Sequence, residues 1–395
     1  MKILAIERLR GVAIIAVYLI HAEFICNAFG YFAPLEKIAS WTGVDLFFVI
    51  SGFVVTLSLE RLLPERAPST RASLAAPLSP HDGRSLRTFY VRRFFRLAPV
   101  GACALFLHFA GSAIAPHLVP STPFMTLRLW SFEAATIVSG IYNFVAPFLP
   151  HMTMAFFWSL NVEEQFYLLL PALFILAGTK RVRTIAAGVV LATIALVIRP
   201  LFSPDSFQIA HCSSQYRFDA LAAGVLIGLQ RDRVKLVLGK VPGWLRKASC
   251  LGALGLLPML PRHTSEHFQI HGGLVIVWSA SALLVACAYV DGRDVLDFPV
   301  VNRALEYVGS RSYAIYVLHT AFLMLDETIY EGAGPGLRAM LGSRAGQTGR
   351  FVLVAAIILV VSELAHRLIE RPCIAAGKRF ATRGAPVATV SEATA

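Results

Sequence analysis

Charged residues are scarce in this chain. Only 15% of its 395 residues are Asp, Glu, Lys or Arg, whereas about 25% is usual in a soluble protein. Hydrophobic residues make up 56% of the chain, and its mean hydropathy is +0.64. This balance excludes an ordinary soluble globular protein and predicts an integral membrane protein.

Several catalytic and metal-binding motifs are also absent. The six cysteines form no Cys-x-x-Cys pair, and there is no His-Glu-x-x-His, no phosphate-binding Gly-rich loop and no Gly-x-Ser-x-Gly elbow. His263, His267 and His271 recur at every fourth position, which would align them on a helix. They follow Pro258 and Pro261 in a short segment, so we predict neither a metal site nor a bound cofactor.

The formal net charge of +12 raises the question of a nucleic-acid partner. The basic residues flank apolar runs and do not form a separate basic domain. Such placement is typical of the cytoplasmic loops of membrane proteins. We therefore expect membrane lipids, and no nucleic acid, as partners.

Apolar runs of about 20 residues can cross a bilayer as helices. The sequence therefore predicts an all-α, polytopic membrane protein with about ten transmembrane helices. The runs lie near 10–29, 42–60, 97–115, 156–177, 184–202, 216–230, 247–261, 272–290, 312–329 and 350–368.

The distribution of Lys and Arg predicts the orientation of these helices. With ten spans and a cytoplasmic N-terminus, 28 of the 36 Lys and Arg residues fall on the cytoplasmic side. Both termini are then cytoplasmic. An eleventh span at 126–149 would reverse the orientation of every later span and destroy this asymmetry of Lys and Arg. We therefore predict a re-entrant or interfacial element there, on the outer side.

We expect residues 1–372 to form one membrane domain. The stretch 61–88 is rich in Pro, Arg, Ser and Ala and is predicted to be a mobile cytoplasmic loop. The tail 373–395 is predicted to be cytoplasmic and disordered. The two halves of the chain show no repeat, which counts against an inverted-repeat transporter.

Two polar residues stand out in the first run, Arg10 and His21. They are eleven positions apart, so on a helix they share one face at a separation of about 16 Å. Arg10 would lie near one membrane surface and His21 deep inside. A buried imidazole can serve as a general base near neutral pH; the alternative is a histidine satisfied by a neighbouring helix.

Three carboxylates lie at the starts of apolar runs. Asp45 could orient an imidazole or bind a polar substrate; alternatively it caps its helix. Glu163 and Glu164 project about 100° apart, so at most one faces a given site. In the same segment Trp158 and Tyr167 are typical of an aromatic belt.

The remaining candidates are arginines, an aspartate and a second histidine. Arg93 and Arg96 share a helix face at the cytoplasmic edge, where they suit a phosphorylated ligand or simply anchor the helix. Arg217 and Asp219 are two apart and cannot face each other, so each should meet a partner on another helix. His319 lies in another apolar run and could be structural or functional.

These residues occur in six motifs. Taken in order, the motifs resemble the membrane acyltransferase-3 family over residues 5–372. They are Arg10 with His21, the stretch 43–52, Arg93 with Arg96, the stretch 158–167, the stretch 216–219 and the stretch 312–319.

The resemblance implies a function. Members of that family O-acetylate bacterial surface polysaccharides, lipopolysaccharide O-antigen, peptidoglycan and some antibiotics. By resemblance His21 is the catalytic histidine, Arg10 belongs to the same motif, and Arg93 with Arg96 serves the acyl-CoA donor. Glu163 matches the glutamate of the motif at 158–167.

We therefore expect an O-acetyltransferase of the bacterial inner membrane. Acetyl-CoA or another acyl-CoA would bind from the cytoplasm, and the acyl group would reach a hydroxyl of exopolysaccharide or O-antigen. Asp45 or Glu163 would orient His21. Direct transfer and a covalent acyl-histidine stay open.

Some members of the family carry an extracytoplasmic esterase-like domain, which this sequence does not show. It would then transfer directly or through a separate extracytoplasmic transferase. The alternative functions are a transporter of a sugar or lipid-linked precursor, and a non-catalytic scaffold.

Overall fold

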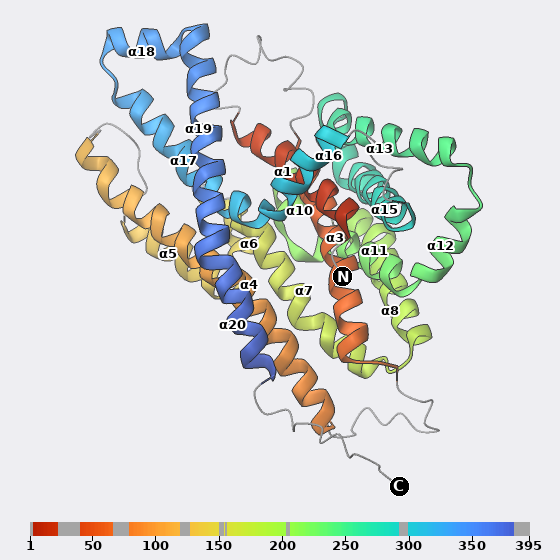
Figure 1. Cartoon of the computed structure of the whole chain (residues 1–395). Helices are drawn as coiled ribbons and strands as arrows, with labels where there is room; N and C mark the ends of the chain where they lie inside the picture. The colour runs from red at the N-terminus through yellow and green to blue at the C-terminus, as the bar shows by residue number, and fades with distance from the viewer. Residues whose placement is uncertain are drawn as a thin grey trace.

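The computed structural model describes residues 3–22, 40–65, 79–118, 127–149, 154, 156–202, 206–291 and 299–382. Within these ranges the chain forms helices and no strands, as the all-α prediction requires. Figure 1 shows the helices gathered into a bundle, with α4 beginning and α3 and α20 ending at its lower end.

Five helices build the candidate site: α1 (Leu4–His21), α3 (Gly43–Leu62), α4 (Pro80–Leu118), α7 (Phe157–Leu176) and α17 (Ser312–Gly332). The other helices surround them. They are α5 (Leu127–Val138), α6 (Tyr142–Val145), η2 (Ala146–Phe148), α8 (Lys180–Thr193), η3 (Ile194–Ile198), α9 (Arg199–Phe202), α10 (Phe207–Cys212), η4 (Ser214–Tyr216), α11 (Phe218–Leu229), α12 (Arg231–Gly239), α13 (Gly243–His263), α14 (Glu266–Phe268), η5 (Gln269–Gly273), α15 (Leu274–Val290), α16 (Pro299–Ser310), α18 (Pro335–Gly342), α19 (Arg344–Ala365), η6 (His366–Glu370) and α20 (Arg371–Thr382).

Each of the ten predicted runs contains helix in the described residues, and residues 23–29 of the first run lie outside them. Among the residues that the structure describes, five helical stretches are long and apolar enough to cross a membrane, as expected of a membrane protein. They are Gly43–Leu62, Pro80–Ile114, Lys180–Phe202, Glu266–Val290 and Arg344–Ala381. The count of ten spans and the cytoplasmic placement of both termini stay predictions.

The doubtful stretch 126–149 is not one long helix. Its described part consists of α5, a turn at Gly140 with φ +76°, and the short elements α6 and η2. Helix α7 anchors this turn, because Gln165 Nε2 donates hydrogen bonds to Gly140 O at 2.6 Å and to Asn143 Oδ1 at 2.9 Å. A re-entrant or interfacial position stays a prediction.

Two predictions of irregular structure need correction. Helix α4 already begins at Pro80, so residues 80–88 of the expected mobile loop are helical. Residues 373–382 of the expected disordered tail belong to α20. They are ordered by packing on α4, where the rings of Phe95 and Phe380 stack at 5.5 Å. The segments 66–78 and 383–395 lie outside the described residues.

Glycines bring the site helices into place. A Cβ on Gly52 would overlap the backbone oxygen of Leu221, and one on Gly224 would overlap that of Val49. Helices α3 and α11 therefore pack backbone to backbone (Figure 1), as small residues allow in membranes. Because Ser51 is the neighbour of Gly52, the same contact fixes the position of Ser51.

Candidate active site

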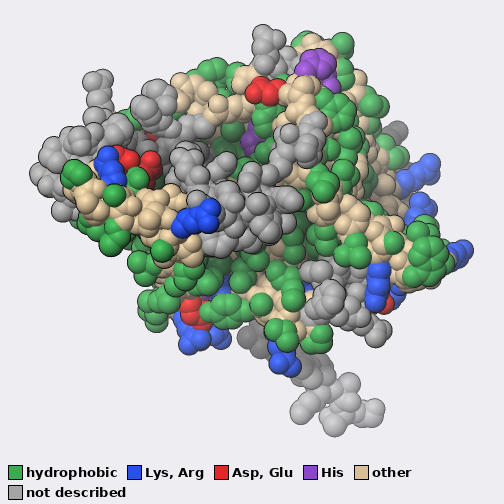
Figure 2. All heavy atoms as spheres, turned by 90° about the horizontal axis from the view of Figure 1, so that it is seen from above, with side chains coloured by type: hydrophobic (Ala, Val, Ile, Leu, Met, Phe, Trp, Pro, Cys, Tyr) green, Lys and Arg blue, Asp and Glu red, His purple; other side chains and the backbone are tan. Residues whose placement is uncertain are grey.

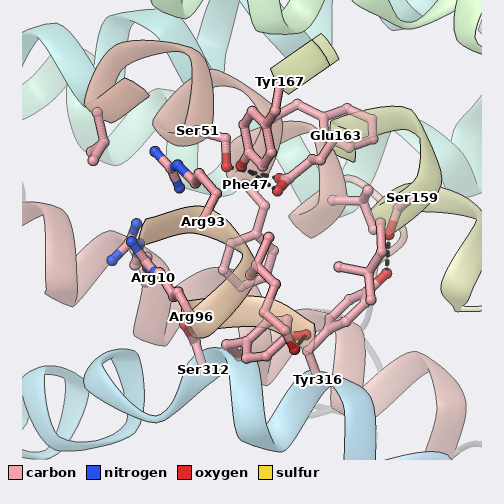
Figure 3. A pocket seen from close by; sticks show the side chains of 16 residues that line it. Arg10, Phe47, Ser51, Arg93, Arg96, Ser159, Glu163, Tyr167, Ser312 and Tyr316 are labelled. Carbon is pink, nitrogen blue, oxygen red and sulfur yellow. Dashed lines mark hydrogen bonds between the residues drawn. The ribbon is translucent and has the colours of Figure 1, made fainter. Parts of the chain in front are cut away.

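A pocket opens between α1, α3, α4, α7 and α17. Figure 3 shows Arg10, Arg93 and Arg96 on one side of it and Ser159 with Tyr316 across from them. The lining residues are Arg10, Val44, Phe47, Phe48, Ser51, Val54, Arg93, Arg96, Leu97, Ser159, Leu160, Glu163, Tyr167, Ser312, Tyr313 and Tyr316.

The three predicted donor-binding arginines thus come together, from α1 and from successive turns of α4. Arg10 Nη1 lies 3.2 Å from Glu7 Oε1, and the Arg93 guanidinium lies 4.7 Å from the centre of the Tyr167 ring. Among the described residues, no carboxylate forms an ion pair with Arg93 or Arg96. Their N–H groups are available to an anionic ligand.

Glu163 faces this pocket, whereas Glu164 does not. Ser51 Oγ donates to Glu163 Oε1 at 2.7 Å, and Tyr167 Oη donates to Glu163 Oε2 at 2.6 Å. Glu164 is exposed and accepts a hydrogen bond from Asn161 Nδ2 at 3.2 Å. The expected divergence of two adjacent carboxylates is confirmed.

The roles of Ser51 and Tyr167 were not predicted from the sequence. Tyr167 is 6% exposed, so it is not a residue of an aromatic belt; Trp158, at 7% exposed, is not one either. One signal could have identified Tyr167: it follows Glu163 by four positions, which places both side chains on one helix face.

His21 lies outside the pocket, in a cluster of rings. Its ring centre is 5.0 Å from that of His319, at an interplanar angle of 67°. Its Nδ1 lies 2.7 Å from the Val17 carbonyl oxygen. Because a carbonyl oxygen only accepts, Nδ1 carries the proton and Nε2 keeps its lone pair.

His319 is fully buried on α17, and its Nδ1 donates to Tyr316 O at 2.7 Å. His108, from α4, completes the cluster: its Nε2 lies 3.2 Å from Thr320 Oγ1. His108 was not predicted from the sequence, although it is an ionisable residue in an apolar run, the same signal that identified His21.

One layer of side chains separates the pocket from the histidines. Tyr316 lines the pocket, and its hydroxyl is hydrogen bonded to Ser159 Oγ at 2.5 Å. Phe156 contacts the ring of Tyr316 at 6.1 Å and that of His319 at 5.8 Å between centres. An acyl group held in the pocket would have to pass this layer to reach His21.

The other charged candidates form a separate buried cluster. Asp45 Oδ1 lies 2.7 Å from Arg217 Nη2, and Asp219 Oδ2 lies 2.5 Å from Arg199 Nη2. No side chain of the four is more than 1% exposed. As expected, Arg217 and Asp219 each pair with a residue of another helix.

This arrangement differs from the prediction that Asp45 or Glu163 orients His21. Asp45 pairs with Arg217, Glu163 with Ser51 and Tyr167, and the imidazole of His21 is held by the carbonyl of Val17. A buried carboxylate is most stable beside a guanidinium, which explains why Asp45 is drawn to Arg217. In the described part of the chain, no group of three or more His, Cys, Asp or Glu is arranged to hold a metal ion.

Comparison with known proteins identifies the family. A family model described as an acyltransferase domain, that of the acyltransferase-3 family, matches residues 3–365. The chain belongs to this family.

Two relatives of this acyltransferase-3 protein have names that state an activity on peptidoglycan. The peptidoglycan O-acetyltransferase OatA of Listeria monocytogenes is 26% identical over 398 residues, which cover 93% of this chain and 55% of OatA. The provisionally named peptidoglycan O-acetyltransferase YrhL of Bacillus subtilis is 24% identical, over 96% of this chain and 56% of its own length. The chain thus spans about half the length of these relatives. No solved structure matches it.

The six acyltransferase-3 motifs meet in three places. The pocket contains Arg10, Arg93, Arg96 and Glu163. The ring cluster contains His21 and His319. The ion cluster contains the remaining members, Asp45, Arg217 and Asp219. The pocket and the ring cluster are adjacent, so the geometry offers an anion-binding region next to a proton acceptor.

Proposed function

We propose that this protein is an O-acyltransferase of the bacterial inner membrane. It takes an acyl group, most simply acetyl, from acyl-CoA bound on the cytoplasmic side. It moves that group to a hydroxyl of a cell-surface carbohydrate. The observation that carries this proposal is the convergence of Arg10, Arg93 and Arg96 on one pocket, whose lining residue Tyr316 contacts His319, the histidine that packs against His21.

The arginine side of the pocket suits the donor. Coenzyme A carries phosphate groups, and guanidinium binds phosphate through two parallel charge-assisted hydrogen bonds. Arg93 and Arg96 have such donors available, because no described carboxylate pairs with them. The opposite side of the pocket, formed by Ser159 and Tyr316, would receive the acyl group of acyl-CoA.

His21 is the catalytic residue of the proposal. Its Nε2 lone pair accepts the proton of the acceptor hydroxyl, the hydroxyl oxygen forms a bond to the acyl carbon, and the carbon–sulfur bond breaks. The CoA thiolate takes up a proton and leaves as the thiol. If His21 instead attacks the acyl carbon itself, an acyl-histidine precedes the same transfer.

The relatives' names support a glycan as the acceptor. Two of them are named for peptidoglycan, which places peptidoglycan beside exopolysaccharide and lipopolysaccharide O-antigen as a candidate. The transporter alternative gains no support from the family match.

The test is acetyl transfer from radiolabelled acetyl-CoA in membrane vesicles, with wild type compared with His21→Ala. We expect label in surface glycan with the wild type alone, at equal amounts of folded protein. The labelled glycan would then identify the acceptor, and label held on a second protein would indicate a separate extracytoplasmic transferase.

Two outcomes would overturn the proposal. A fully active His21→Ala variant would show that His21 takes no part in the reaction. No transfer from acyl-CoA by the wild type, with uptake of a sugar precursor in its place, would favour transport.

A further inference from the structure

A second imidazole faces the catalytic one. The rings of His21 and His319 meet edge to face at 5.0 Å between centres. In both residues Nδ1 bonds to a backbone carbonyl one helical turn earlier, Val17 O for His21 and Tyr316 O for His319. Two proton acceptors, the Nε2 atoms, therefore remain on neighbouring rings.

The Nε2 atom of His319 is buried without a partner. The residue is 0% exposed, and no described group forms a hydrogen bond to this nitrogen. A buried acceptor with no donor is costly and rare, so it calls for an explanation. A proton that arrives during the reaction would provide the missing bond.

The third histidine of the cluster does not compete for this role. The Nε2 of His108 is already engaged with the hydroxyl of Thr320. Thr320 follows His319 on α17, and Phe156 contacts the rings of both His108 and His319. Phe156, the residue before α7, thus packs on the His319 ring, and His108 from α4 contacts both Phe156 and Thr320.

The cluster is also close to the outer face of the bundle. Helix α1 ends at His21, at the upper end in Figure 1. Figure 2 views that end and shows a histidine side chain inside a hollow. In our predicted topology this is the side from which the acceptor arrives.

We propose that His319 is the proton partner of His21. The proposal rests on the proposed function. The hydroxyl proton of the acceptor passes to Nε2 of His21 as the carbon–oxygen bond forms and the carbon–sulfur bond breaks. That proton is then shared with Nε2 of His319 until the leaving thiolate takes it. His319 acts through His21 and is a positioning residue.

The first test is His319→Phe. Phenylalanine keeps a ring against His21 and Phe156 and removes both nitrogens. We expect kcat to fall about 100-fold, within the usual range for loss of a proton-transfer group, with the KM for acetyl-CoA unchanged. His319→Gln, which retains an accepting oxygen, should recover part of the rate. The control is His366→Phe, because His366 does not line the pocket and is hydrogen bonded to Glu370, outside the ring cluster.

A second test separates chemistry from packing and does not need the Phe variant to fold. In His319→Ala, added imidazole should restore transfer, and pyrrole, a ring of the same shape without an accepting nitrogen, should not. Restoration by both rings, or by neither in a folded variant, would make the role structural and overturn the inference.

The outcomes distinguish this inference from the proposed function. Wild-type kcat in His319→Phe together with an inactive His21→Ala would overturn the inference alone. An active His21→Ala would overturn both.

Discussion

Helix α1 carries Arg10 and His21 on one face, yet the two side chains lie in unlike surroundings. Arg10 lines a pocket with two more guanidinium groups, a carboxylate and hydroxyls, and is 15% exposed. His21 packs against the ring of fully buried His319. One region can hold a charged ligand, whereas the other presents a proton acceptor among aromatic rings. A single helix thus contributes one residue to the ligand-binding pocket and another to the proton-accepting cluster, and the two regions stay separate.

The largest expected effect is on the KM for acetyl-CoA, and it would show that the two regions act in different steps. In Arg93→Ala with Arg96→Ala, each lost charge-assisted hydrogen bond costs about 1.5–3 kcal/mol. Since these bonds form when the donor binds, the KM for acetyl-CoA should rise on the order of 100-fold or more, with a smaller change in kcat.

Arg92→Ala is the matched control. Arg92 lies on the same helix, is exposed and does not line the pocket. Steady-state kinetics in vesicles measures both variants. A fall in kcat at unchanged KM would contradict the assignment of donor binding to one region and proton transfer to the other, because the arginines would then act in the chemical step.

The next prediction concerns the ion cluster, which belongs to neither region. Arg217→Ala leaves Asp45 as a buried, unpaired carboxylate, which should cost about 3–5 kcal/mol of stability. Thermal unfolding in detergent should show the loss. The double change Asp45→Leu with Arg217→Met should recover much of it, because no buried charge is then unpaired. If Arg217→Ala keeps full stability but loses acyl transfer, Asp45 and Arg217 take part in the reaction instead.

A smaller effect is expected where α3 meets α11. Gly52→Ala would drive a methyl group into the backbone of Leu221, at a cost of about 1–3 kcal/mol. The shift would also displace Ser51 from Glu163. Gly188→Ala on α8 meets nothing within 4 Å and should be neutral or stabilising. Equal unfolding temperatures for the two variants would show that the close contact is unimportant.

The smallest expected effect is that of Tyr167→Phe. It removes one hydrogen bond to Glu163, worth about 0.5–1.5 kcal/mol, and keeps the ring beneath Arg93. The KM for acetyl-CoA should rise roughly two- to tenfold. A loss of kcat comparable to that of His21→Ala would mean that Glu163 and Tyr167 belong to the reacting centre, and the comparison between the two regions would fail.

Much of the helix content could be predicted from local pattern. Apolar runs of bilayer length mark the helices, and the 100° between neighbouring positions separates Glu163 from Glu164. Residues 80–88 and 373–382 were wrongly expected to be irregular. Residues 80–88 are mostly polar, and residues 373–382 are mostly small, but α20 gains order by packing on α4, as the stacked rings of Phe95 and Phe380 show.

The sequence by itself determined the membrane class, most helices and the chemical identity of the candidate residues, because these depend on composition and on short-range periodicity. Only the tertiary structure decided which candidates meet. Asp45 pairs with Arg217, and His21 meets His319. Each partner lies far along the chain, and their meeting depends on how helices pack, through contacts such as Gly52 on Leu221. Periodicity within one helix carries no information about such partners.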